Sequence, residues 1–262
     1  TLGLAAHRFC RKKNWAFTTS YHTQFPEYVR KRFPIPITWT SAILRRFHSK
    51  AARTMVATNS MQQQLEERGF VNLARWERGV DTELFKPSVN RQSLDGRDPV
   101  WVYVGRVAVE KNIEAFLKTE LPGTKRVIGH GPSFDELNKA YPEVEFLGYK
   151  FGAELAAAIA EGDVFVFPSL TDTFGLVMIE AMACGLPVAA YPVTGPIDVV
   201  KNGVTGVLHD DLKTAALAAL KLDPQVCRDE ALNRTWAHAT AQFFGNLVPV
   251  TGIEAASAPA EV

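Results

Sequence analysis

The second half of the chain alternates short apolar runs with amphipathic segments. Residues 100–104 form a run of β-branched and aromatic side chains, which is typical of a strand buried on both faces of a sheet. The segments that follow have lengths that predict parallel strands joined by right-handed helical crossovers. The pattern therefore predicts a doubly wound, Rossmann-like α/β domain. The further expected strands are 126–129, 144–148, 163–168 and 187–191, and the expected helices are 110–118, 133–140, 153–159 and 175–183.

The first 86 residues give weaker signals, in which short strand patterns are separated by helical ones. Residues 15–20 and 54–58 are each expected to form a strand. Ser60 is typical of a helix N-cap and predicts a helix over residues 61–68. Residues 86–99 are polar and rich in turn-forming side chains, so they indicate a linker between two domains.

Composition and charge are those of an ordinary globular protein without a strong electrostatic field. Of the 262 residues, 47% are hydrophobic and 22% are charged, and the formal net charge is +1, so nothing favours nucleic acid as a partner. Three separated cysteines form neither a disulfide framework nor a zinc ligand set, which indicates a reducing compartment. No apolar run approaches the roughly 20 residues of a membrane-spanning helix, so we expect a cytoplasmic protein. The tail at 251–262 has few large apolar side chains and is expected to be disordered.

The candidate chemistry lies where the expected strands of the second domain end, because ligands of open parallel sheets bind at the carboxyl edge. The first of these strands leads into Gly105 and Arg106, with Lys111 five residues later, and the next strand leads into Gly129 and Gly131. Glycines let a ligand approach the backbone, and two cations beside a helix N-terminus suit a diphosphate. Taken singly, the two cations could be a solvated pair at a helix start, and a lone Gly-x-Gly is a weak signal.

Two carboxylates flank the next strand end. Asp172 lies in the loop that follows strand 163–168, and Glu180 lies one to two turns inside the helix that follows. Both can face the strand ends with the helix N-terminus between them, which suits a ligand that has a central diphosphate and a sugar at either end. Taken singly, Asp172 could be a turn residue and Glu180 an exposed helix position.

Four segments resemble family 4 of the retaining GT-B glycosyltransferases. They are Val-Gly-Arg-Val-Ala-Val-Glu-Lys-Asn at 104–112, Gly-His-Gly-Pro at 129–132, Pro-Ser-Leu-Thr-Asp-Thr-Phe-Gly-Leu-Val-Met-Ile-Glu-Ala-Met-Ala-Cys-Gly-Leu-Pro-Val at 168–188, and Gly-Val-Asp-Thr-Glu-Leu-Phe at 79–85. The Asp-Thr-Phe-Gly variant is similar to that of mannosyl- and glucosyltransferases of lipids, which include GDP-mannose-dependent enzymes. The resemblance extends to about Pro249.

The resemblance implies a GT-B fold, with two Rossmann-like domains that each contain a parallel sheet. The first domain is expected to be truncated at its start, because the family's early strands have no counterpart here. The implied parts are a partial acceptor-side domain at 1–86, a nucleotide-sugar-binding domain at 99–228, and a final helix at 229–247 that crosses back to the first domain.

The resemblance also implies roles for individual residues. Arg106 and Lys111 match the cations that hold the donor diphosphate and stabilise the leaving group. Glu180 matches the second acid of the family's pair, which binds the ribose, and Asp172 takes the first position, where Glu is usual. His22 matches a histidine that faces the transferred sugar, although from its neighbours alone it could be a turn residue. The implied catalytic residues are Arg106, Lys111, His22 and Asp172, and the implied donor-binding residues are Gly105, Gly129, Gly131, Thr173, Phe174, Gly175, Leu176 and Glu180.

The implied reaction is transfer of a hexose, with retention, from a GDP- or UDP-hexose to a lipid or glycan acceptor. No Asp-x-Asp motif follows a strand, so we expect neither a metal nor another cofactor, because Arg106 and Lys111 can supply the positive charge. Residues 30–33 and 44–48 mix cations with aromatic side chains. This mixture fits weak peripheral contact with the inner face of the cytoplasmic membrane, although such a stretch is more often a solvated helix face.

Other classes of protein fit parts of the sequence. A non-catalytic nucleotide-sugar-binding fragment, or a pseudoenzyme, would bind the donor without turnover. A dinucleotide-dependent oxidoreductase would need Gly-x-Gly-x-x-Gly after the first strand of the second domain, which the segment beginning at Gly105 does not supply. A peripheral membrane module is the third alternative.

Overall fold

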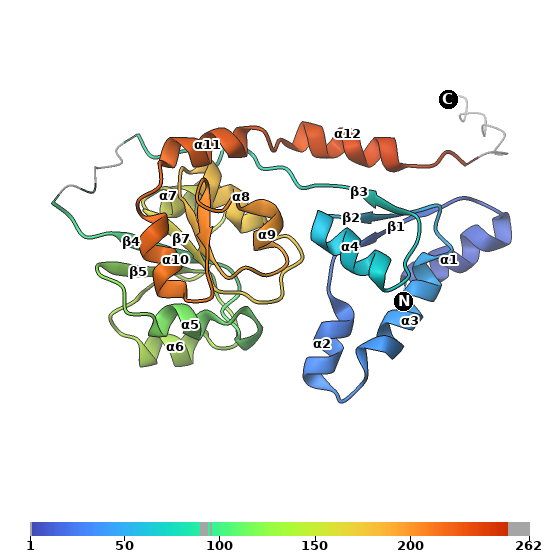
Figure 1. The fold of residues 1–262 in the computed structure, drawn as a ribbon, viewed down its shortest axis with the longest axis horizontal. Coiled ribbons are helices and arrows are strands. Elements are labelled where there is room, and N and C mark those ends of the chain that lie inside the picture. Colours follow the sequence, from blue (N-terminus) through green and yellow to red (C-terminus); the bar gives the residue numbers. More distant parts are fainter. Residues whose placement is uncertain (1, 90–93, 95, 251–262) are drawn as a thin grey trace, which may run out of the picture.

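The computed structural model describes residues 2–89, 94 and 96–250, which form two lobes (Figure 1). The tail expected to be disordered, 251–262, lies outside the described residues, as do part of the expected linker and the side chains of Tyr28, Lys31 and Arg32. Each lobe is built on its own parallel sheet, so the predicted α/β class with parallel sheets is confirmed.

Within the described residues, the sheet of the second lobe has six parallel strands in the order β6-β5-β4-β7-β8-β9. The chain builds outward from β4 to β6 and then returns to pair β7 with the other side of β4. At such a switch point the loops that leave two neighbouring strands diverge and open a crevice at the carboxyl edge. The loops after β4 and β7 therefore border the place where a ligand is expected. The strands are β4 (Val100–Val104), β5 (Thr124–Ile128), β6 (Glu145–Phe146), β7 (Val164–Phe167), β8 (Val188–Ala190) and β9 (Gly206–Leu208).

Helices cover both faces of this sheet. Val102 and Phe165 pack on one face with α7, α8 and α11, whereas Trp101 and Val164 pack on the other with α5, α6 and α10, and all four side chains are fully buried. Burial on both faces explains why these strands are continuous apolar runs in the sequence. The helices are α5 (Ile113–Lys118), α6 (Phe134–Ala140), α7 (Gly152–Ala160), α8 (Leu176–Ala183), α10 (Leu212–Ala219) and α11 (Pro224–Leu232).

The first lobe is smaller. Its described residues form a three-stranded parallel sheet in the order β1-β2-β3, with a buried cluster at Tyr21, Val56, Met61, Leu65 and Phe70. Within the described residues, no helix has the length and apolar character needed to cross a membrane. The elements of this lobe are α1 (Leu2–Lys13), β1 (Thr18–Tyr21), α2 (Phe25–Arg32), α3 (Ile37–His48), β2 (Arg53–Val56), α4 (Asn59–Glu67) and β3 (Leu73–Arg75).

The N-cap predicted at Ser60 is wrong. The cap of α4 is Thr58, which has an extended backbone, and its hydroxyl accepts a hydrogen bond from the amide of Met61 at 3.2 Å. Ser60 instead contacts the other lobe: its amide donates to Asp198 at 2.9 Å, and its hydroxyl donates to the same carboxylate. Asp198 belongs to the short helix α9 (Pro196–Val199).

The helix predicted over 110–118 is interrupted. A 3-10 turn, η1 (Val109–Lys111), is followed by Asn112 and then by α5. Asn112 has a φ of 52°, in the left-handed region that Asn tolerates better than most residues, and its amide nitrogen donates to the carbonyl of Pro168 at 3.0 Å. This break places Lys111 at the end of a tight turn beside the loop that follows β7.

The last described helix, α12 (Trp236–Asn246), lies along the first lobe (Figure 1). Gln242 accepts from the amide of Glu77 at 2.8 Å, and the side chain of Asn246 donates to the carbonyl of Arg75 at 2.6 Å. Arg53 donates to the carbonyl of Gly245 at 2.7 Å. The predicted segment 229–247 contains the end of α11 and the whole of α12.

Candidate active site

The candidate site lies at the carboxyl edge of the larger sheet, where the loops after β4 and β7 meet. The hydroxyl of Tyr103 donates to the carbonyl of Arg106 at 2.9 Å and holds the loop after β4. The loop after β7 begins at Pro168, which accepts from Asn112. Asp172 lies in this second loop, and Lys111 ends the turn beside it.

Lys111 and Asp172 form an ion pair in this position. The ammonium nitrogen lies 2.7 and 2.9 Å from the two carboxylate oxygens, and both side chains are largely shielded from solvent. Arg106 pairs instead with Glu110 at 3.1 Å, and its side chain is 58% exposed. Two of the predicted catalytic residues therefore contact each other directly, and Arg106 contacts a carboxylate that the sequence did not single out.

Glu180 lies on α8 and is half-buried. Burial raises the pKa of its carboxyl group to about 7, with no opposing contribution from a cation or a hydrogen-bond donor among the described residues. A carboxyl group in this state can bind ligand hydroxyls, which would supply the hydrogen bonds that the protein does not.

Two hydroxyl groups in the loop after β7 also lack a partner. The side-chain oxygens of Ser169 and Thr171 are buried and have no hydrogen-bond partner within the described residues. Buried polar groups are usually satisfied, so these hydroxyls suggest contacts that a ligand or water would complete. The sequence placed both residues in this loop, but nothing in their spacing singled them out.

The predicted glycines serve two different purposes. Gly175 has a φ of 80° and caps α8, and its carbonyl accepts a hydrogen bond from the amide of Met178 at 2.9 Å. Gly129 is needed for packing, because a Cβ atom there would lie 2.0 Å from the carbonyl oxygen of Gly105. Likewise, a Cβ atom at Gly131 would lie 2.3 Å from the carbonyl oxygen of Val107. The structure thus gives these three glycines a reason to be present that does not require a ligand.

His22 follows β1 in the first lobe and contacts the second lobe. The hydroxyl of Thr173 donates to its carbonyl oxygen at 2.9 Å. Its ring contacts the hydroxyl of Ser20 through Nε2 and the guanidinium of Arg78 through Nδ1, the latter at 2.7 Å. Burial, and then the charge of Arg78, lower the pKa of His22. Arg78 was not predicted from the sequence, although it directly precedes the Gly-Val-Asp segment.

A cavity of about 460 Å³ lies between the two lobes beside these residues. Its wall on the first lobe carries three apolar side chains, and its wall on the second lobe carries charged ones. The cavity therefore joins Lys111 and Arg106 to an apolar surface on α2. Its lining residues are Thr23, Phe25, Val29, Phe33, Arg106, Glu110 and Lys111.

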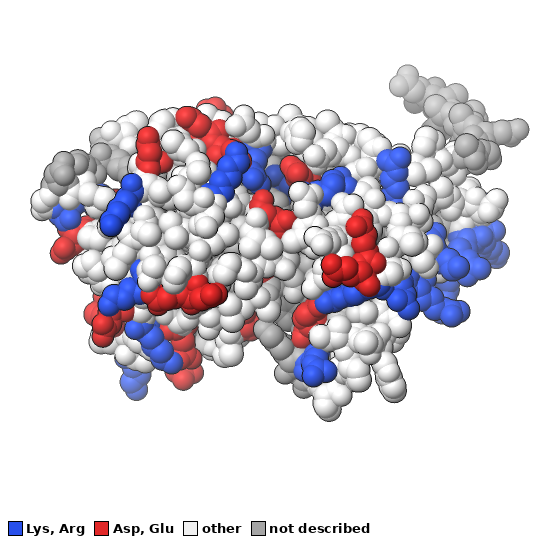
Figure 2. Space-filling view, viewed as in Figure 1, with Lys and Arg blue, Asp and Glu red and all other residues white. Residues whose placement is uncertain are grey.

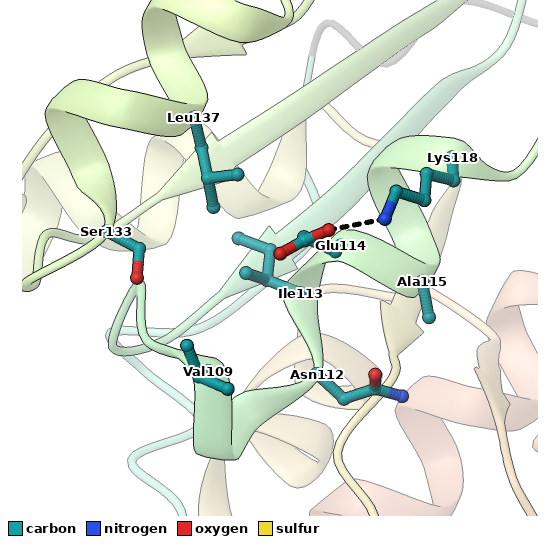
Figure 3. Close-up of a pocket in the computed structure, with 8 residues that line it drawn as sticks. All are labelled: Val109, Asn112, Ile113, Glu114, Ala115, Lys118, Ser133 and Leu137. Carbon is teal, nitrogen blue, oxygen red and sulfur yellow. Dashed lines mark hydrogen bonds and ion pairs between the residues drawn. The ribbon is translucent and has the colours of Figure 1, made fainter.

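A second cavity, of about 320 Å³, lies between η1, α5 and α6 (Figure 3). Its charged lining residues, Glu114 and Lys118, point toward each other and form an ion pair of 2.5 Å. None of the predicted site residues lines it. Among residues 2–89, 94 and 96–250, no group of three or more His, Cys, Asp or Glu side chains is arranged to hold a metal ion.

The fold and the site define an α/β protein with a candidate ligand site at the carboxyl edge of a parallel sheet, and comparison with known proteins specifies the family. Residues 98–222 match the family described as glycosyl transferases group 1, and residues 1–84 match glycosyltransferase family 4. The chain is 31% identical over 270 residues to a GDP-mannose-dependent alpha-mannosyltransferase of Mycobacterium tuberculosis, covering 96% of this chain and 71% of that protein. The chain belongs to the group 1, family 4 glycosyltransferases.

Other relatives broaden this comparison. The chain is 36% identical over 211 residues to the sulfoquinovosyl transferase SQD2 of Arabidopsis thaliana, but it spans only 41% of that protein. The solved structure of Anabaena Alr3699/HepE in complex with UDP and glucose matches this chain with a TM-score of 0.73 at 19% identity. The matched region covers 93% of this chain and 74% of the HepE chain. At this level of identity, the likeness supports the GT-B fold alone.

Proposed function

We propose that the protein transfers a hexose, with retention at the anomeric carbon, from a GDP- or UDP-hexose to an acceptor hydroxyl. The observation that carries this proposal is the Lys111–Asp172 pair at the carboxyl edge of the sheet, beside the N-terminus of α8. A lysine there suits the donor diphosphate, and a carboxylate beside it suits a hydroxyl of the transferred sugar. The names of the relatives, which act on mannosyl and sulfoquinovosyl groups, support a sugar nucleotide as the donor.

In the proposed reaction, the bond between the anomeric carbon and the diphosphate oxygen breaks as the acceptor oxygen attacks from the same face. The acceptor proton passes to the departing phosphate. Lys111 and Arg106 stabilise the negative charge that develops on the leaving group, and the dipole of α8 adds to this effect. Asp172 and His22 orient the sugar, and Glu180 accepts hydrogen bonds from the ribose.

We further propose that this chemistry requires no metal and no other cofactor. Lys111 and Arg106 both line the cavity between the lobes, so two permanent cations border the space where the leaving group would form. Transfer assays with and without EDTA test this part. Loss of transfer in EDTA, restored by a divalent cation, would contradict it.

The cavity between the lobes favours an amphipathic acceptor, of the lipid type, over a glycan. Phe25 and Phe33 on its first-lobe wall are 53% and 57% exposed, which is unfavourable unless an apolar group covers them. A hydroxyl attached to an apolar chain could enter between this wall and Lys111. A purely hydrophilic acceptor would leave the aromatic wall in contact with water.

Weak contact with a membrane, on its cytoplasmic side, is consistent with such an acceptor. Trp39 and Ile43 lie on α3 and are 70% and 71% exposed. Figure 2 shows Lys and Arg side chains gathered on the same lobe, near α1 and α3, whereas charges of both signs mix over the second lobe. Sedimentation with vesicles that contain an anionic lipid, compared with neutral vesicles, tests this contact.

A panel of nucleotide sugars tests the donor assignment. In a panel of UDP-glucose, GDP-mannose and ADP-glucose, we expect at least one of the first two to raise the melting temperature, and the same donor labelled in its hexose to yield a labelled lipid product. No stabilisation by any of them would contradict the proposed function. Stabilisation without transfer or hydrolysis would favour the alternative of a non-catalytic nucleotide-sugar-binding protein. The chain spans 71% of the mannosyltransferase and 41% of the sulfoquinovosyl transferase that it matches.

A further inference from the structure

Two residues distant in sequence hold His22: Thr173 contacts its backbone and Arg78 contacts its ring. Thr173 fixes its backbone by donating to its carbonyl oxygen at 2.9 Å. Arg78 fixes its ring, with Nη2 at 2.7 Å from Nδ1. The guanidinium of Arg78 also lies 4.2 Å over the ring of Trp76 and donates through Nη1 to the carbonyls of Trp76 and Glu77, at 3.1 and 3.2 Å. No ion pair among the described residues includes Arg78, so its contact with His22 does not compete with a carboxylate.

The backbone around Arg78 is anchored where two segments of the chain cross. The amide of Val80 donates to the carbonyl of Arg234 at 2.9 Å, and Val80 pairs with Thr235 in an isolated bridge. A Cβ atom at Gly79 would lie 2.3 Å from the amide nitrogen of Trp236, so the two segments touch through the glycine. This contact fixes the direction from which Arg78 approaches His22.

The chemistry of the two side chains decides which ring nitrogen carries the proton. A guanidinium only donates hydrogen bonds and stays protonated in proteins. Nδ1 of His22 must therefore accept, which leaves the proton of the neutral ring on Nε2, where it faces the hydroxyl of Ser20. A ring turned by 180° would place Cδ2 against the guanidinium and would lose the bond.

We propose that Arg78 is a positioning residue that holds His22 as the neutral imidazole protonated on Nε2, so that the ring donates a hydrogen bond to a hydroxyl of the transferred sugar. The hydrogen bond from His22 to the sugar rests on the proposed function, whereas the assignment of the tautomer does not. Ser20 accepts the Nε2 proton when no sugar is bound. A second proton on the ring would face the guanidinium, and this repulsion, added to burial, lowers the pKa of His22. Lys111 and Asp172 of the second lobe are paired with each other.

Imidazole ¹⁵N chemical shifts test the tautomer directly, because protonated and unprotonated ring nitrogens differ strongly. The full chain is labelled with ¹⁵N at histidine, and the signals of His22 are identified as those that disappear in His22→Gln. We expect these signals to show the Nε2-protonated form. Arg78→Met keeps an unbranched side chain and removes the guanidinium donor, so the shifts of His22 should move toward a mixture of tautomers. Arg78→Lys should retain the wild-type pattern.

The ring of His48, whose Nδ1 lies 2.9 Å from the hydroxyl of Thr19, serves as an internal control for folding. Its shifts should not change in any Arg78 variant. An Nδ1-protonated His22 in the wild type would overturn the proposal. So would unchanged His22 shifts in Arg78→Met.

Ligand binding tests the consequence for the sugar. Measured by calorimetry, Arg78→Met should lower the affinity for a nucleotide hexose by about 5–10-fold, which is the effect of one lost hydrogen bond. The matching nucleoside diphosphate, which lacks the hexose, should bind as it does to the wild type. Equal weakening of both ligands would overturn the link between Arg78 and the sugar. If the wild type binds neither ligand, the proposed function fails, and the ¹⁵N measurement still decides the role of Arg78.

Discussion

The two lobes differ in how their functional residues are held. The second lobe has buried clusters on both faces of its sheet, and these fix the loops that carry Lys111, Asp172 and Glu180. The first lobe has a small cluster, and no described side chain of α1 is buried. Besides Ser20 of its own sheet, His22 depends on contacts outside that sheet, with Thr173 and Arg78. We infer that the candidate residues of the second lobe are fixed by its own packing, whereas His22 of the first lobe is positioned by contacts with its neighbours.

The largest expected effect comes from damaging the core of the second lobe. Phe165 is fully buried, and Phe165→Ala should lower the free energy of unfolding by about 3–5 kcal/mol. Chemical denaturation measures this loss, and nucleoside diphosphate binding should weaken with it.

Leu65→Ala is the matched change in the first lobe. Leu65 is also fully buried, so the substitution should cost about 2–5 kcal/mol. Because the proposed diphosphate site lies in the other lobe, the Kd for a nucleoside diphosphate should stay within about twofold of the wild-type value. A loss of affinity as large as that of Phe165→Ala would show that the two lobes are not independent.

The next effect concerns catalysis rather than folding. Lys111→Ala should lower kcat by about 10²–10³-fold, because negative charge on the leaving group develops in the transition state. The Kd for the nucleotide sugar should change by less than about tenfold. Single-turnover transfer and calorimetry separate the two quantities.

Lys118→Ala is the control for this prediction, because Lys118 is 64% exposed and pairs with Glu114 away from the site. It should leave both quantities unchanged. A Lys111→Ala variant with normal kcat and only weaker donor binding would contradict the catalytic assignment.

A third effect should appear in the first lobe alone. Burial lowers the pKa of His48 to about 4, below its unfolded value of 6.5. Protonation therefore favours the unfolded state: the stability of this lobe is fully present above about pH 6.5 and declines as the pH falls toward 4, by on the order of 2–3 kcal/mol. The protection factors of β2 amides, taken relative to intrinsic exchange at each pH, should fall over this range, while those of β7 amides change less.

His48→Leu should flatten this dependence for β2. A wild-type loss of protection that is equal in β2 and β7, or unchanged in His48→Leu, would refute the assignment to His48.

The smallest effect concerns the pH dependence of donor binding. The pKa of Glu180 is raised to about 7, so its carboxylate form becomes available only as the pH rises through that value. If the carboxylate accepts ribose hydroxyls, the affinity for a nucleotide sugar should rise about tenfold between pH 6 and pH 8. The diphosphate of a nucleotide sugar does not titrate in this range, so it is a better probe than a nucleoside diphosphate. A Glu180→Gln variant with the same pH profile as the wild type would contradict this role.

The sequence alone predicted much of the second lobe and less of the first. Apolar runs located its central strands because both faces of that sheet are buried, and the rule for strand ends directed attention to Lys111, Asp172 and Glu180. His22 was found only through resemblance to a family. The short strands of the first lobe carry too few buried positions for a clear pattern.

Contacts between distant segments could not be predicted in this way. Arg78 and His22 are 56 residues apart, and Ser60 and Asp198 are 138 residues apart. The N-cap was misplaced because two hydroxyl residues were available: Thr58 caps the helix, whereas Ser60 makes a tertiary contact with Asp198. No local rule reports such a contact.

The most direct test of the central claim, that the second lobe binds a nucleotide sugar through its diphosphate, is calorimetric titration with UDP-glucose and GDP-mannose. The account predicts saturable binding of at least one donor with 1:1 stoichiometry, normal in Lys118→Ala and lost in the double variant Arg106→Ala/Lys111→Ala. The absence of binding to the wild type, or unchanged affinity in the double variant, would contradict it.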